Sequence, residues 1–125
     1  MIIVDTSVWI EFLRKNDKIF LHLEEKIQNR EAYAIEPVFG ELLQGARGQR
    51  ENDIIKLYWN YLPKVEEKNI WIEAGIYSST HKLISKGVGL IDSIIIILAK
   101  KTQSKIWTLD KKLKAVLSSN EKYAL

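Results

Sequence analysis

The chain has 125 residues, of which 46% are hydrophobic and 28% charged, a balance typical of one globular domain with its own core and not of a disordered chain. It contains no cysteine, which excludes disulfides, thiolate zinc sites and thiol nucleophiles. Its formal net charge of +3 permits a nucleic-acid partner but does not require one.

Short runs rich in β-branched residues alternate with segments of helical spacing along the chain. We expect strands at three apolar runs and at two weaker edge positions: Ile2–Val4, Ala32–Ile35, Lys64–Glu66, Lys105–Leu109 and Lys122–Leu125. Apolar residues at helical intervals predict the helices Ser7–Leu13, Phe20–Ile27, Pro37–Arg47, Ile54–Leu62, Ile70–Ser85, Ile91–Thr102 and Lys111–Leu117. This alternation predicts an α/β fold, a mostly parallel sheet with helices on both faces, in one domain spanning residues 1–125. In such folds the functional crevice lies beyond the carboxyl ends of the strands.

None of these segments suits a membrane. The longest apolar run, Ile94–Ala99, stops at two lysines and is far shorter than the roughly 18 residues of a membrane span. Asp5 interrupts the first apolar run before it could act as the core of a signal peptide. We therefore expect a cytoplasmic protein with no membrane partner.

Two of the predicted strands run directly into an aspartate. Ile2–Val4 is followed by Asp5, and the strand that starts at Lys105 is followed by Asp110. If these strands are neighbours in a parallel sheet, both carboxylates emerge at the same edge. Each aspartate also precedes a helix, so an ordinary role as N-cap stays open for both.

Asp92 begins the most apolar of the predicted helices. Because each helical residue advances by about 100°, Ile95, Ile96 and Ala99 share its face. An unpartnered charge buried there would cost several kcal/mol, so we interpret Asp92 as a buried acid with a functional reason to be charged. The alternative is an N-cap, with the helix starting one residue later.

Glu41 stands at the margin of the apolar arc of the helix Pro37–Arg47. Gly40 and Gly45 flank it, although glycine in a helix interior costs about 1 kcal/mol relative to alanine. One interpretation is the close approach of another element or of a ligand beside the carboxylate. The other is a solvated glutamate on an exposed helix face.

Four carboxylates in one crevice would repel each other unless a cation compensated them. With no cysteine, and with His22 and His81 on separate predicted helices, the ligands would all be oxygens, which favours Mg²⁺ or Mn²⁺ over zinc. Metal-assisted hydrolysis of phosphodiesters is the chemistry that such a site favours.

Four segments in this order resemble the PIN-domain ribonucleases, and among them the VapC type of toxin from toxin–antitoxin pairs. They span nearly the whole chain: Ile2-Ile3-Val4-Asp5-Thr6-Ser7-Val8-Trp9-Ile10, Glu41-Leu42-Leu43-Gln44-Gly45-Ala46-Arg47, Gly89-Leu90-Ile91-Asp92-Ser93-Ile94-Ile95 and Thr108-Leu109-Asp110. The resemblance implies a parallel sheet of about five strands, RNA cleavage with Mg²⁺ or Mn²⁺, a homodimer, and inhibition by an antitoxin protein whose tail enters the active site.

The resemblance also implies roles for individual residues. The four acidic positions of the family, which are catalytic and bind the metal, fall on Asp5, Glu41, Asp92 and Asp110. The polar positions that support them fall on Thr108 and on Ser7 or Thr6. Gly40 and Leu113 depart from the family pattern, in which a small polar residue and an aromatic residue are common, and neither departure removes an acid. Near the crevice, three basic residues are candidates for holding the RNA backbone: Arg47, Lys111 and Lys112.

Two alternatives to a ribonuclease have the same fold class. One is a non-catalytic module that binds RNA or a protein. The other is a receiver-type signalling domain, which would need an acceptor aspartate at the end of a central strand. The strand Ala32–Ile35 ends at Glu36 instead, which argues against this second alternative.

Overall fold

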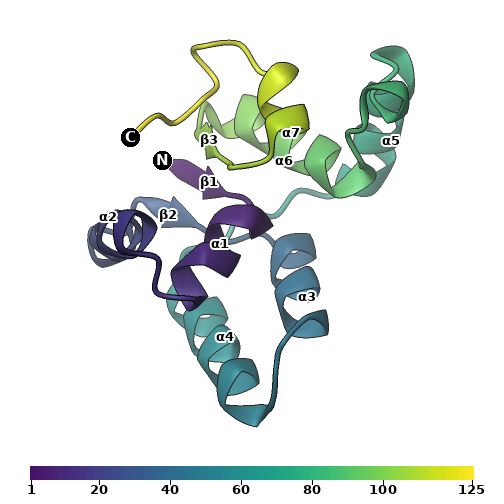
Figure 1. The fold of residues 1–125 in the computed structure, drawn as a ribbon. Helices are drawn as coiled ribbons and strands as arrows, with labels where there is room; N and C mark the ends of the chain where they lie inside the picture. Colours follow the sequence, from purple (N-terminus) through teal and green to yellow (C-terminus); the bar gives the residue numbers. More distant parts are fainter.

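Three short parallel strands form the centre of the computed structural model, which describes residues 1–125 (Figure 1). They are β1 (Ile2–Val4), β2 (Ala32–Tyr33) and β3 (Lys105–Trp107), in the order β2-β1-β3. Ile2 is paired with Ala32 on one side and with Lys105 on the other. All three residues of β1 are buried, as expected for a strand covered on both faces. The predicted α/β class with a parallel sheet is confirmed.

Single parallel bridges extend this sheet at both edges. Ala34 bridges to Lys64, and Ile106 bridges to Lys122. These are the positions at which the sequence predicted two weak edge strands. The sheet therefore has three strands with a one-residue bridge at each edge, where about five strands were expected. The strand Lys105–Leu109 is also shorter than predicted, because Thr108 turns out of the sheet toward Asp5.

The helices form two groups, one on each side of the strands (Figure 1). The first group holds α1 (Thr6–Leu13), α2 (Asp17–Gln28), α3 (Glu36–Gln44) and α4 (Gln49–Tyr61). The second holds α5 (Ile70–Thr80), a short 3₁₀ turn (Ile84–Lys86), α6 (Leu90–Thr102) and α7 (Lys111–Ala115). No helix is long and apolar enough to cross a membrane.

Several helix boundaries differ from the sequence prediction. The helix predicted to run from Ile70 to Ser85 ends at Thr80, because Lys82 adopts a positive φ of 53° and the Leu83 amide donates to the Ser78 carbonyl at 3.0 Å. α4 begins at Gln49 and not at the predicted Ile54. The prediction missed its first turn because the residues there are polar and show no apolar periodicity. α2 likewise begins before Phe20, where the Asn16 side chain caps it.

The hydrophobic core joins both groups of helices to the sheet. Trp9 is packed edge-on against Phe12 and Phe39, with ring centroids 5.5 and 5.3 Å apart. On the other side of the sheet, Ile94, Ile95 and Ile96 of α6 are fully buried. Because β1 and β3 run parallel between these layers, Asp5 and Thr108 leave the sheet at the same edge.

Candidate functional site

Asp5 lies at the centre of this edge, immediately after β1. Its backbone N–H donates to the Trp107 carbonyl at 2.9 Å, so the chain is still held to β3 at this point. The side chain is only 6% exposed, and its Oδ2 accepts hydrogen bonds from Ser7 Oγ at 2.8 Å and Thr108 Oγ1 at 2.7 Å. It occupies the N-cap position of α1 without making a side-chain capping bond. The buried carboxylate is therefore stabilised by two hydroxyls and not by the helix.

The Ser7 and Thr108 hydroxyls connect three segments of the chain. Ser7 Oγ accepts from the Leu109 amide, and Thr108 Oγ1 accepts from the Asp110 amide, both at 3.0 Å. Each hydroxyl thus donates to Asp5 and accepts from the backbone that follows β3. Both residues were predicted from the resemblance as support for the acids, and this network gives that support a structural form.

Asp92 lies in the first turn of α6, three residues after the N-cap Gly89. Its Oδ2 accepts from the Gly89 N–H at 3.4 Å, so it contributes to capping from inside the helix and is not itself the N-cap. The position of Asp92 on the apolar face of the helix predicted a buried side chain, but the structure shows it half-buried. Burial, together with the negative charges of Asp5, Asp110 and Glu41, raises the pKa of Asp92 to about 6, and the hydrogen bond from Gly89 opposes this shift.

Asp110 is exposed and caps α7. Its Oδ1 accepts from the amides of Lys112 and Leu113 at 2.8 and 3.1 Å. The ordinary interpretation as an N-cap is therefore correct for Asp110. It does not exclude a second role, because Oδ2 has no hydrogen-bond partner within the chain.

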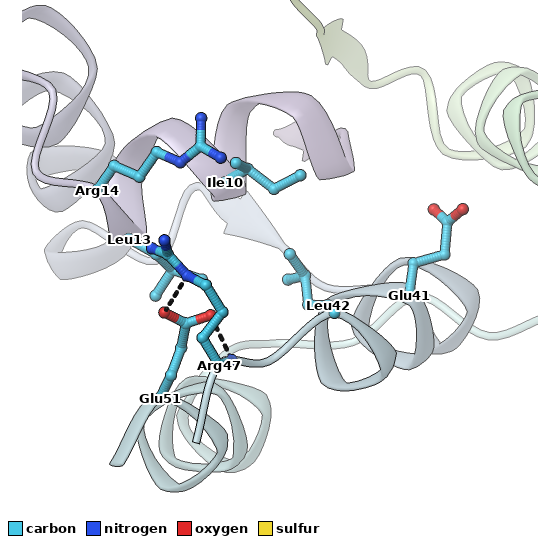
Figure 2. A pocket seen from close by; sticks show the side chains of 8 residues that line it. Ile10, Leu13, Arg14, Glu41, Leu42, Arg47 and Glu51 are labelled. Atoms are coloured by element: carbon cyan, nitrogen blue, oxygen red, sulfur yellow. Dashed lines mark hydrogen bonds and ion pairs between the residues drawn. The ribbon is translucent and has the colours of Figure 1, made fainter. Parts of the chain in front are cut away.

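Glu41 projects from α3 and is exposed to solvent (Figure 2). Its Oε1 accepts from Thr6 Oγ1 at 2.7 Å, which ties α3 to the first turn of α1. The expectation that a glycine beside it permits a close approach within the chain is wrong. A Cβ at Gly40 would have nothing within 4 Å, and one at Gly45 would meet only the carbonyls of its own helix.

The four acids share a further property. In each, the chain forms hydrogen bonds to one carboxylate oxygen and leaves the other without a partner. None of them forms an ion pair with a lysine or arginine. The edge of the sheet therefore carries uncompensated negative charge, and four oxygens there are available to a ligand.

This donor set fits a hard divalent cation, because carboxylate oxygens are the ligands that Mg²⁺ and Mn²⁺ prefer. The pKa of Asp92 is raised first by burial and then by the charges of Asp5, Asp110 and Glu41, and a bound cation would counteract both effects. The carboxylates do not form a preformed metal site, since no three acidic or histidine side chains are arranged to hold an ion.

The basic residues predicted near the crevice differ in their availability. Arg47 is paired with Glu51, with 3.8 Å between its Nε and Glu51 Oε2, in a groove between α1 and the end of α3 (Figure 2). Lys111 and Lys112 have no ion-pair partner.

Sequence reasoning did not anticipate the Gly89 amide as a partner of Asp92, since a backbone group leaves no signal in a residue pattern.

Comparisons with known proteins agree with one another. Residues 2–117 match the family model of the PIN domain. The chain is 32% identical over 123 residues to Ribonuclease VapC32 of Mycobacterium tuberculosis, in strains CDC 1551 and H37Rv, covering 96% of this chain and 93% of that protein. The crystal structure of FitAcB from Neisseria gonorrhoeae contains a similar chain, with a TM-score of 0.60, 21% identity and 90% of each chain covered. At that identity the similarity concerns the fold alone.

Proposed function

Because the chain belongs to the PIN-domain family, we propose that it is an endoribonuclease that hydrolyses RNA phosphodiesters with the help of Mg²⁺ or Mn²⁺. The observation that carries this proposal is the set of four carboxylates at one sheet edge, each with one free oxygen and none with a cationic partner. The sequence similarity to a ribonuclease over nearly the whole length supports it, with residues 1–125 as one catalytic domain.

In this proposal Asp5 and Asp92 hold the ion directly, and Glu41 and Asp110 complete its surroundings. The chemistry that such a cation supplies when bound is neutralisation of charge at the phosphate and activation of water. The chain's own contribution is positioning. Ser7 and Thr108 fix the Asp5 carboxylate by hydrogen bonds of 2.8 and 2.7 Å, so one of its oxygens stays turned away from the hydroxyls.

The biological role that we propose is that of the toxin in a toxin–antitoxin pair, with a cognate antitoxin protein as partner. The similarity to Ribonuclease VapC32 supports this role. We also propose a homodimer. An exposed apolar face on α5, formed by Trp71, Ile72 and Ile76, is the surface that supports it.

Two measurements on the purified chain test the catalytic proposal. First, Mg²⁺ or Mn²⁺ should raise the midpoint of thermal unfolding in proportion to saturation, because the ion binds only the folded site. Second, Asp5→Asn should abolish cleavage of a single-stranded RNA pool while RNA binding persists. Asp17→Asn, an exposed acid of α2 away from the site, is the matched control and should cleave like the wild type.

The same experiment separates the enzyme from a non-catalytic module of the same fold. A module would bind RNA or a protein without cleaving RNA at any concentration of divalent cation. Unchanged cleavage in Asp5→Asn would instead show that the activity does not depend on these carboxylates and would refute the assigned site.

A further inference from the structure

A second pocket lies between the end of α5, the 3₁₀ turn Ile84–Lys86 and α7. Its volume is about 400 Å³, within the range of ligand pockets. Leu83 and Val116 form an apolar floor, while Tyr77, His81, Lys86 and Lys112 bring rings and ammonium groups to it. Figure 1 shows the three helices α5, α6 and α7 together on this side of the sheet.

The walls of this pocket continue into the segments that carry two of the acids. Lys112 follows Asp110 by two residues, and its amide donates to Asp110 Oδ1 at 2.8 Å. Lys86 precedes Gly89 by three residues, and the Gly89 amide donates to Asp92 Oδ2 at 3.4 Å. Two lysines of the pocket therefore belong to the segments whose backbone amides hydrogen-bond Asp110 and Asp92.

The charge of the pocket is positive and uncompensated. No acidic residue lines it, and neither lysine forms an ion pair, whereas other cations of the chain do so, among them Lys26, Lys100 and Lys101. Gly87 makes room for Lys112: a Cβ built there would lie 2.6 Å from Lys112 Cδ and 3.2 Å from its Nζ. Gly87 also has a φ of +78°, so both its conformation and the lysine exclude a larger side chain.

The aromatic part of the pocket consists of Tyr77 and His81, whose ring centroids lie 4.1 Å apart at an interplanar angle of 39°. His81 is exposed at the end of α5, and Tyr77 is half-buried behind it. An exposed ring next to lysines combines the two contacts that single-stranded nucleic acids make with proteins, stacking of a base and neutralisation of a phosphate.

We propose that this pocket is a subsite for the RNA substrate, in which a base stacks on His81 and Lys86 and Lys112 hold the adjoining phosphates. The inference rests on the proposed ribonuclease function and adds to it the place where the substrate is held next to the cleaved bond. RNA is the occupant that the site favours, because the lysines alone would suit any anion, whereas an aromatic ring beside them suits the base of a nucleotide.

The charges are tested by fluorescence anisotropy with a labelled, random-sequence single-stranded RNA pool, in EDTA so that no cleavage occurs. Lys86→Gln and Lys112→Gln should each weaken binding several-fold. The negative slope of log affinity against log salt should become shallower by about 1.4 in the double variant, because two contacts at about 0.7 each are lost. Lys114→Gln changes the net charge equally, on the same helix and outside the pocket, and should leave both quantities close to the wild type.

The stacking contact is tested separately. His81→Ala should weaken RNA binding about fivefold or more without changing the salt slope, because a base–ring contact releases no counterions. His81→Phe retains a ring and should restore most of the affinity. Circular dichroism of each variant shows that the fold is intact, as expected for an exposed position after the last turn of α5.

The outcomes distinguish the subsite from the function on which it rests. If the double lysine variant binds like Lys114→Gln, or if His81→Ala binds like the wild type, the subsite is wrong, while cleavage of RNA by the wild type still supports the ribonuclease. If the wild type cleaves no RNA with Mg²⁺ or Mn²⁺ while the lysine and His81 variants still lose binding as described, the proposed ribonuclease function fails and the pocket stands as the RNA site of a non-catalytic module.

Discussion

Asp92 combines partial burial with three negative neighbours, and both features make its charged form costly in the folded chain. Its pKa is raised from 3.8 to about 6, so the native state binds this proton more tightly than the unfolded state does. The penalty is absent below the unfolded pKa, develops as the pH rises toward about 6, and is fully present at neutral pH.

Asp92→Asn should therefore stabilise the metal-free protein at neutral pH. We expect a gain of about 1 kcal/mol in the free energy of unfolding, a value reduced for the solvent screening of a half-exposed group. Urea unfolding in EDTA at pH 7 and below the unfolded pKa of 3.8 measures it, and the gain should vanish at the lower pH. The same gain at both values would contradict a charge effect. The variant should also lose most of the thermal shift produced by Mg²⁺.

Thr108 acts through its hydroxyl, which donates to Asp5 and accepts from the Asp110 amide. Thr108→Val keeps the shape of the side chain but leaves a buried carboxylate with one donor fewer. We expect the free energy of unfolding to fall by about 1–3 kcal/mol and metal binding to weaken. Thr108→Ser retains the hydroxyl and should recover most of both. Chemical denaturation and the metal-induced thermal shift are the measurements, and equal behaviour of the two variants would show that the hydroxyl is unimportant.

At the level of single residues, the sequence predicts the site as far as local rules extend. Asp5 and Asp110 follow strands, and parallel strands end at one edge, so their proximity could be expected. The hydrogen bond that the Leu109 amide donates to Ser7 Oγ could not be expected from physical rules, because it joins positions 102 residues apart. Glu41 is a comparable case, since only the family resemblance distinguished it from an exposed helix glutamate.

At the scale of the secondary-structure element, the proposed site and the start of α7 share Asp110. Oδ1 caps the helix while Oδ2 is free, so the two roles can be separated by substitution. Asp110→Asn keeps a good capping side chain and should retain the native unfolding midpoint while RNA cleavage falls sharply. Asp110→Ala should lose cleavage and, in addition, about 1 kcal/mol of stability. A stability loss of the same size in both variants would contradict the capping role.

Elements with a strong pattern were predicted well, and their ends less well. β1 is wholly apolar and α6 has a long apolar centre, and both lie almost where the pattern placed them. The ends of α5 and α3 depend on backbone contacts instead. α5 stops where the Leu83 amide bonds to the Ser78 carbonyl, and α3 stops at Gln44 and not at Arg47, with Gly45 as its C-cap.

At the scale of the whole molecule, the helices leave an apolar surface on α5 uncovered. Trp71, Ile72 and Ile76 of α5 are 50%, 67% and 64% exposed, on the side of the sheet opposite α2. Helix faces of soluble proteins are normally polar where they meet water, so this face is the surface that we assign to the proposed homodimer.

Ile76→Glu places a charge at the centre of that face and should weaken self-association at least tenfold, because an unpaired carboxylate buried in an apolar interface is strongly unfavourable. Leu21→Glu is the matched control: Leu21 is 68% exposed on α2, on the other side of the sheet. Sedimentation equilibrium should show a dimer for the wild type and for Leu21→Glu, and a monomer for Ile76→Glu, with native circular dichroism in all three. If Ile76→Glu is still a dimer, the interface lies on another surface. If the wild type is a monomer, the proposed homodimer is wrong, but the carboxylate site is unaffected because it lies within a single chain.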